Sequence, residues 1–280
     1  MNNIFKIIYL IIFIITGTIQ VNSAEKIDYL KTDWSFKGLF GKFDRASLQR
    51  GYQVYKEVCA SCHSMKYVSF RNLSEPGGPE FTEEQVKAIA ASYEVNDGPN
   101  SEGEMFLRPA KLSDKFVMPY ENVKAAQAAN GGAYPPDMSV LAKARSGGVD
   151  YIYSLLLGYE DAPSDVKLDD GVYYNKFMYG NKIKMAEPIT DDLIEYGDGT
   201  PATKEQMAKD VTTFLMWAAE PHLESRHKMG FKAILYLIIL TVLVYFSMKK
   251  IWSRIESEVY YITIFDNIIF SFKSHLSICF

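Results

Sequence analysis

Residues Cys59 to His63 bring two thiols and an imidazole into one five-residue segment, Cys-Ala-Ser-Cys-His. Two residues between the cysteines allow their sulfurs to meet the two vinyl groups of a single porphyrin, and the histidine that follows then lies under the iron. This C-x-x-C-H pattern is the signature of c-type haem attachment. The sequence therefore predicts one covalent haem c, bound through Cys59 and Cys62, with His63 on the iron.

Three other interpretations of the motif compete with haem attachment, and chance is one of them. A redox-active disulfide of the C-x-x-C type would need a βαβ context, which the surrounding sequence lacks. A zinc site would need a second pair of ligands, and the only other cysteine is Cys279, next to the C-terminus. An odd count of three cysteines implies no disulfide framework.

A haem iron held by one histidine needs a sixth ligand or keeps an open position. The chain has eleven methionines, so composition does not select one, and a lone methionine is more often core filler than a ligand. Met185 is the preferred candidate because it lies in a loop between Gly180 and Pro188, where the backbone can hold its sulfur in place. Met178 and Met118 remain alternatives on these local grounds.

Helix signals outnumber strand signals around the motif. Apolar residues recur at helical spacing over 46–58 and lead directly into Cys59. Capping boxes at Thr82 and Thr203 open two further helices, the second of which carries an apolar face until Pro221. Shorter helices are predicted over 122–130, 139–145 and 151–157, and loops over 96–103, 159–171 and 195–201.

Two apolar segments define a membrane topology. Residues 1–24 have the layout of a secretory signal peptide, although a lone Lys6 gives a thin basic region and an uncleaved anchor stays open. Residues 230–248 form a predicted transmembrane helix, followed at once by Lys249 and Lys250. The positive-inside rule then puts the tail, residues 249–280, in the cytoplasm and the domain of residues 25–229 outside. The short stretch 222–228 is interpreted as a polar linker.

The domain outside the membrane is acidic. Residues 25–229 hold 24 Lys and Arg against 31 Asp and Glu, a net charge of −7. Nucleic acid binding normally requires a basic face, so it is disfavoured. A basic protein partner would be attracted by this field, although the charge can equally serve solubility alone.

The chain closely resembles the cytochrome c1 family, the haem subunits of ubiquinol–cytochrome c reductase (bc1) complexes, over nearly the whole soluble part. The matching segments appear in family order before a single membrane helix. They are residues 50–65, 97–100, 103–106, 108–114, 129–137, 144–148, 150–151, 154–159, 185–188, 198–203, 208–211 and 217–221.

This resemblance implies a fold, a site and partners. The fold is mainly α, a cytochrome c-like haem domain with long loops plus one C-terminal transmembrane helix. The family's axial methionine falls on Met185, its Arg and Tyr near the haem propionates on Arg145 and Tyr151, and its Pro-Pro turn beside the ring on Pro135 and Pro136. The implied partners are cytochrome b and the Rieske iron–sulfur protein, with cytochrome c as electron acceptor, on the periplasmic side of a bacterial inner membrane.

Two segments depart from the family pattern. The tail from Ile255 to Phe280 is longer and more apolar than the usual short basic end, and we interpret it as interfacial or packed against a partner. The Gly/Pro-rich loop from Glu75 to Pro79 has no secure counterpart.

The predicted function is single-electron transfer. The oxidation of quinol itself is expected to belong to the partners and not to this chain. We expect an acidic loop to dock the lysines of cytochrome c through Glu94, Asp97, Glu102 and Glu104, unless it is an ordinary solvated loop. The rivals are a haem peroxidase with a displaceable sixth ligand and the membrane-anchored cytochrome c subunit of a terminal oxidase.

Overall fold

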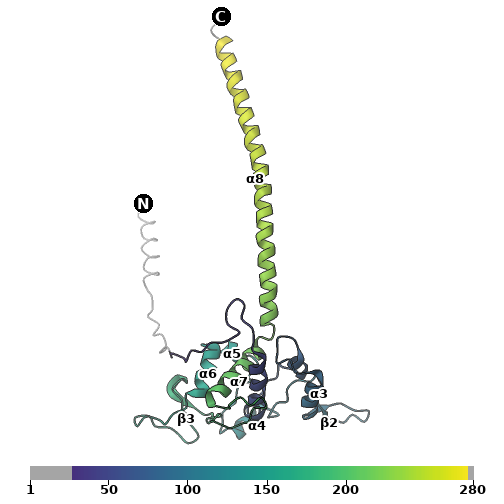
Figure 1. Ribbon diagram of the computed structural model, residues 1–280, viewed down its shortest axis with the longest axis vertical. Helices are drawn as coiled ribbons and strands as arrows, with labels where there is room; N and C mark the ends of the chain where they lie inside the picture. The colour runs from purple at the N-terminus through teal and green to yellow at the C-terminus, as the bar shows by residue number, and fades with distance from the viewer. Residues whose placement is uncertain (1–26, 277–280) are drawn as a thin grey trace, which may run out of the picture.

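The computed structural model describes the backbone of residues 27–276 and the side chains of residues 27–255. The predicted signal peptide, residues 1–24, and Cys279 lie outside the described residues. A broad domain of helices and long loops carries one very long helix that leaves it on one side (Figure 1). The prediction of a mainly α fold is confirmed.

The domain is built on short helices that begin close to where the sequence predicts. Asp44 caps the first of them, its side chain accepting from the Ala46 N–H, and Thr82 caps the next with both bonds of its capping box present. The helix bounds are α2 Arg45–Glu57, α3 Glu83–Ala91, α4 Val123–Ala129, α5 Leu141–Ala144, α6 Gly148–Leu157 and α7 Lys204–Ala219. Three 3-10 turns accompany them, η1 Cys59–Ser61, η2 Phe70–Ser74 and η3 Tyr179–Asn181.

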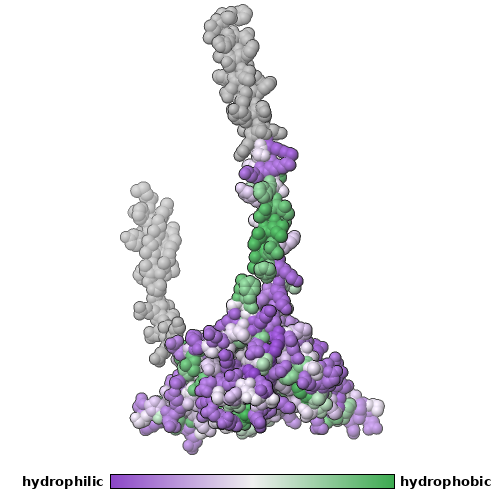
Figure 2. Space-filling view, in the orientation of Figure 1, coloured by the Kyte–Doolittle hydropathy of each residue, from purple (hydrophilic) through white to green (hydrophobic). Residues whose placement is uncertain are grey.

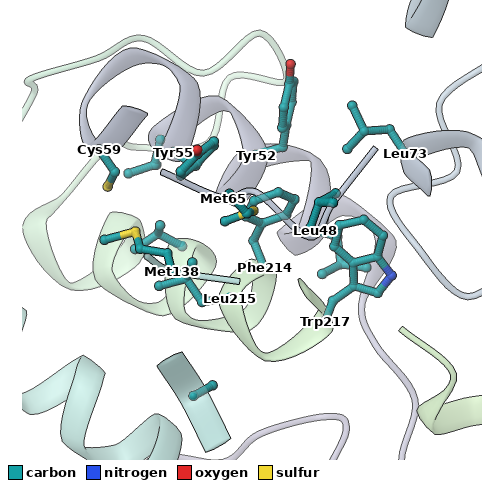
Figure 3. Packing of buried hydrophobic residues seen from close by; sticks show 14 of the residues in the cluster. Leu48, Tyr52, Tyr55, Cys59, Met65, Leu73, Met138, Phe214, Leu215 and Trp217 are labelled. Carbon is teal, nitrogen blue, oxygen red and sulfur yellow. The ribbon is translucent and has the colours of Figure 1, made fainter. Parts of the chain in front are cut away.

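Helices α2 and α7 pack against each other at the centre of the core. Figure 3 shows Leu48 and Tyr55 of α2 near Phe214, Leu215 and Trp217 of α7, and the Tyr52 ring lies 5.7 Å from that of Phe214 between centroids. The close approach needs glycine at position 51, because a Cβ there would lie 2.1 Å from the Asp210 carbonyl oxygen. Burial of these aromatic and aliphatic side chains stabilises the pair, and it fixes the direction in which α2 delivers the cysteine motif.

The second capping box is only half formed. The Thr203 hydroxyl accepts from the Gln206 N–H at 3.2 Å, as the sequence predicts. The Gln206 side chain, however, donates to the buried carboxylate of Asp210 at 2.9 Å instead of returning to the helix start. The prediction was wrong on that bond because a buried acceptor on the next turn takes the amide.

Two short hairpins were not predicted. Strands β1 (Glu94–Asp97) and β2 (Phe106–Pro109) pair antiparallel, as do β3 (Tyr173–Tyr174) and β4 (Lys182–Ile183). Strand β1 of the first hairpin includes the first two residues of the segment 96–103, which the sequence predicts as a loop. The side chains of this hairpin are mostly exposed, so it lacks the apolar alternation that identifies a half-buried strand.

Helix α8 (Leu223–Leu276) carries a stretch, Leu223–Ile255, that is long and apolar enough to cross a membrane. None of its apolar window is buried against the described chain, and Figure 2 shows a hydrophobic band along it. The residues predicted as a polar linker, 222–228, are helical from Leu223 onward and form the first turns of α8. The backbone stays helical to Leu276, through much of the tail that departs from the family pattern.

Candidate functional site

The cysteine motif lies at the end of α2, where the chain tightens into η1. The N–H groups of Cys62 and His63 both donate to the Cys59 carbonyl oxygen, at 3.1 and 2.9 Å. These two hydrogen bonds to one carbonyl oxygen turn the backbone sharply. As a result Cys59 faces the core, 8% exposed, while Cys62 is half-buried. The Tyr55 hydroxyl donates to the His63 carbonyl at 3.3 Å and ties the motif back to α2.

The thiol of Cys59 is unsuited to redox or zinc chemistry. Burial, and to a smaller extent the nearby Cys62, raises the pKa of Cys59 to about 12. Redox-active and zinc-binding cysteines act as thiolates and need a lowered pKa. In addition, the described residues contain no group of three or more His, Cys, Asp or Glu side chains placed to hold a metal ion.

The His63 imidazole is buried and held in one tautomer. Its Nδ1 lies 2.8 Å from the Pro136 carbonyl oxygen, and a carbonyl can only accept, so Nδ1 carries the proton. Burial lowers the pKa of His63, against the raising effects of the Pro136 bond and of Asp137. A neutral ring with Nδ1 donating leaves the Nε2 lone pair for a metal, the form in which histidine binds iron.

Asp137 fixes the segment that carries the Pro136 carbonyl. It accepts from the Ser64 hydroxyl at 2.8 Å, the Lys66 N–H at 3.0 Å and the Ser139 N–H at 2.9 Å. Burial alone would raise the pKa of Asp137, but these hydrogen bonds outweigh it and hold the pKa below its usual range. The ionised carboxylate therefore joins the motif to the Pro135–Pro136 turn.

A cavity of about 190 Å³ opens beside Cys62. Its walls include Pro135 and Tyr134 on one segment and Met118 and Tyr120 on another. These four side chains are apolar or aromatic and suit contact with a porphyrin edge, while Ser64, Glu121 and Asn122 add polar groups to the lining.

The candidate methionines lie in different surroundings. Met185 is half-buried, and its backbone carbonyl accepts from the Tyr159 hydroxyl at 3.0 Å. The sulfur of Met178 already accepts from the Tyr151 hydroxyl at 3.8 Å. Met118 is 51% exposed on the cavity wall. Of the three, only Met185 combines partial burial with a backbone held by a tyrosine.

Arg145 and Tyr151, the two residues that the family resemblance places near the propionates, lie close enough for the charge of Arg145 to act on Tyr151. Burial raises the pKa of Tyr151, while the positive charge of the nearby Arg145 guanidinium opposes the rise. Arg145 is exposed and follows α5, whereas Tyr151 is half-buried on α6. The ring of Tyr29 packs edge-on against Tyr151 at 5.6 Å between centroids.

Two residues that position the Met185 loop were not predicted from the sequence. Lys184, next to Met185, donates from Nζ to the Gly131 carbonyl at 2.8 Å, and so links the methionine loop to the loop that leads to Pro135. Tyr159 holds Met185 from a position 26 residues earlier. Segment 154–159 was among the matches to the family, but nothing local pointed to this long-range bond.

The residues present therefore fit a covalent haem. They offer two cysteines at vinyl spacing, an imidazole with a free Nε2, apolar and aromatic side chains beside Cys62, and a thioether in a loop that Lys184 links to Gly131. Nothing in the described chain offers the multiple polar ligands of a structural metal ion.

Comparison with known proteins gives one consistent family. The model described as "Cytochrome C1 family" matches residues 34–255. "Cytochrome c1-2, heme protein, mitochondrial" of Solanum tuberosum is 50% identical over 225 residues, covering 80% of this chain and 85% of that protein. "Cytochrome c1" of Rhodospirillum rubrum is 45% identical over 258 residues, covering 86% and 93%.

A longer relative shows the same similarity. "Cytochrome b/c1" of Bradyrhizobium diazoefficiens is 50% identical over 239 residues, which cover 79% of this chain but only 35% of that protein. The match to the family model takes in the cysteine motif, Met185, the Arg145–Tyr151 pair and the first part of α8. The chain belongs to the cytochrome c1 family.

Proposed function

We propose that this chain is the haem subunit of a bc1 complex and passes single electrons from the Rieske iron–sulfur protein to cytochrome c. The observation that carries the proposal is the hydrogen bond from His63 Nδ1 to the Pro136 carbonyl within the C-x-x-C-H turn. It orients the imidazole and leaves Nε2 for iron. Membership of the cytochrome c1 family supports the same conclusion.

Cys59 and Cys62 would hold one haem c by thioether bonds, and His63 and Met185 would be the two axial ligands. When bound, the haem supplies a one-electron iron couple whose potential histidine–methionine ligation keeps high. Met185 is favoured over Met178 because the Tyr151 hydroxyl already uses the Met178 sulfur. It is favoured over Met118 because the latter is largely exposed to water.

Arg145 and Tyr151 would meet the haem propionates. Their proximity in the structure supports a shared anionic target, since guanidinium and phenol groups donate strong hydrogen bonds to carboxylates. Pro135 and Pro136 would lie beside the ring. There Pro135 contributes to the apolar wall and Pro136 contributes its carbonyl to His63.

Membership of the cytochrome c1 family supports the proposed partners and membrane location. Cytochrome b and the Rieske protein would share one membrane complex with this chain, and a basic cytochrome c would accept the electron. We place the haem domain, residues 25–229, on the periplasmic side of a bacterial inner membrane, with the signal peptide over 1–24, the span over 230–248 and the tail over 249–280 in the cytoplasm. The single long apolar helix of the described chain supports a single-pass anchor.

Purification from membranes with a reduced-minus-oxidised spectrum tests this function. We expect c-type bands, a pigment that acidified acetone does not extract, and co-purification with cytochrome b and a Rieske protein. Extraction of the pigment would overturn covalent attachment. Ready binding of carbon monoxide or cyanide would favour a peroxidase, and co-purification with oxidase subunits would favour a terminal oxidase.

A further inference from the structure

The segment between Trp34 and Phe43 forms a well-built loop with an apolar tip. The Gly41 N–H donates to the Gly38 carbonyl at 3.2 Å, which makes a four-residue turn with Leu39 and Phe40 at its two central positions. Both side chains point away from the core, and they are 69% and 72% exposed. We call residues 37–42 the tip loop.

The base of the tip loop is anchored in the core. Trp34 and Phe36 stack at 5.5 Å, and Phe36 meets Phe43 at 5.2 Å, all three of them buried. The Lys42 N–H donates to the Ser35 carbonyl at 3.0 Å and closes the loop. Gly41 is required there, because a Cβ would lie 2.2 Å from the Phe36 carbonyl oxygen. The exposure of Leu39 and Phe40 is therefore imposed by the packing beneath them.

The tip loop rises beside the base of α8, as the purple loop next to the long helix in Figure 1 shows. Phe40 contacts Phe231 of α8, with ring centroids 6.3 Å apart. Phe231 begins the apolar run that extends to Met248. At 1.5 Å per residue that run is ~27 Å long, close to the ~30 Å hydrocarbon thickness of a bilayer. In a bilayer spanned by this run, Phe40 would therefore lie level with the edge of the hydrocarbon layer.

The charges around the tip suit a lipid surface. Lys42 is exposed at the end of the tip loop, and Lys228 and Lys232 are exposed on α8 on either side of Phe231. Lysines next to exposed aliphatic and aromatic side chains are the pattern of an interfacial anchor, in which the apolar groups enter the boundary and the ammonium groups meet phosphates.

We propose that Leu39 and Phe40 enter the headgroup and acyl boundary of the same bilayer that holds α8, so that the haem domain touches the membrane at a second point. Lipid is favoured over a protein partner because the tip loop protrudes from the domain and Phe40 contacts Phe231, where the apolar run of α8 begins. Two attachment points would restrict rotation of the domain about the helix axis. The inference needs α8 in a membrane but does not depend on the proposed electron-transfer partners.

Site-specific photocrosslinking tests the proposal in the full-length, haem-loaded chain in its native membrane. Phe40 is replaced by p-benzoyl-L-phenylalanine, the membranes are irradiated, and the labelled peptide is analysed by mass spectrometry. The matched control carries the same label at Tyr179, which is also 72% exposed but lies in η3, beside the β3–β4 hairpin. A positive control carries it at Tyr236, 64% exposed within the apolar stretch of α8.

We expect phospholipid adducts at positions 40 and 236 and none at 179. An adduct between position 40 and another protein would assign the tip to a subunit interface and overturn the lipid assignment. Absence of any lipid adduct at 40, while 236 gives one, would overturn it as well. The haem spectrum of each variant reports that the chain has folded, so failure here is distinct from failure of the proposed function.

Discussion

The Nδ1 atom of His63 lies 2.8 Å from the carbonyl oxygen of Pro136. A backbone carbonyl cannot be removed by mutation, but the side chain that holds it can. Asp137 is that side chain, because its carboxylate accepts from Ser64 and Lys66, next to the imidazole, and from Ser139 on its own segment, and so joins the two segments. The orientation of the ring thus depends on a neighbouring carboxylate that does not touch it.

Replacing Asp137 by Ala should destabilise the haem-loaded protein by about 1–3 kcal/mol, since the Lys66 and Ser139 N–H groups lose their acceptor. The measurement is denaturant unfolding followed by haem absorbance. Asp137→Asn, which keeps one acceptor oxygen, is the matched variant and should cost less. Equal stability of the Ala variant and the parent would mean that water replaces the carboxylate at no cost.

The same carboxylate predicts a pH dependence. The pKa of Asp137 is lowered in the folded state, so its contribution to stability is present above the unfolded value of about 3.9 and is lost as the pH falls through the folded pKa. The free energy of unfolding of the parent should therefore decrease with acid more steeply than that of Asp137→Asn. If the free energy of unfolding fell with acid equally steeply in the two proteins, Asp137 would not be the group responsible.

Met185→Leu should lower the reduction potential and abolish the far-red iron–sulfur band of the oxidised protein, because a thioether ligand favours ferrous iron. Carbon monoxide should then bind to the reduced protein. Met178→Leu is the matched control, since it removes the sulfur that accepts from Tyr151, and it should leave the band in place. Loss of the band in Met178→Leu and its retention in Met185→Leu would reverse the ligand assignment.

Local signals predicted the elements that deliver the motif. The apolar spacing before Cys59 and the box at Thr82 depend on residues close in sequence, and α2 and α3 follow them to within a residue. The predicted bond from the Gln206 side chain back to Thr203 was wrong because the side chain donates to Asp210 instead. Asp210 is buried between α2 and α7, two helices that only the tertiary fold brings together. The sequence did not predict that the polar residues before the apolar run are helical, and there Glu224 is buried and pairs with Arg45 of α2.

The residues of the candidate site also fall into those that local signals predict and those that they do not. Spacing alone identifies the cysteines and His63, because their chemistry is contained in five residues. Arg145, Tyr151 and the proline turn came only from family resemblance, since a helix-end arginine and a half-buried tyrosine have no local feature that marks them. Lys184 and Tyr159 act across 53 and 26 residues of sequence, and no periodicity encodes such contacts.

Replacing Arg50 by Gln should destabilise the domain by about 3–5 kcal/mol, because it leaves a buried charge without its counter-ion. Asp210 is fully buried, and Arg50 binds both of its carboxylate oxygens, at 2.8 and 3.2 Å. Asp198, the second partner of Arg50, is exposed, so Asp198→Asn should cost much less than Arg50→Gln. Thermal unfolding of both variants checks the contrast, and similar losses would show that the buried pair contributes no more than the exposed one.

The β1–β2 hairpin and its connecting loop carry the four acidic residues expected to dock cytochrome c. Asp97 forms an ion pair with Arg108, which also binds Asp114 at 2.6 Å, so this carboxylate is committed to holding β1 and β2 together. The other three acidic residues of the docking hypothesis are exposed. They are Glu94, Glu102 and Glu104. We therefore expect these three, without Asp97, to form the attracting surface.

Changing the three glutamates to glutamine should slow electron transfer to a basic cytochrome c about tenfold at low ionic strength, and the difference should shrink as salt screens the charges. Stopped-flow mixing over a salt series measures both effects. The matched control removes the same charge from an exposed loop elsewhere, by changing Asp161, Asp165 and Asp169 to Asn. Total charge is then equal in the two variants, so equal rates would mean that net charge alone attracts the partner, whereas a slower glutamate variant places the docking face at the hairpin.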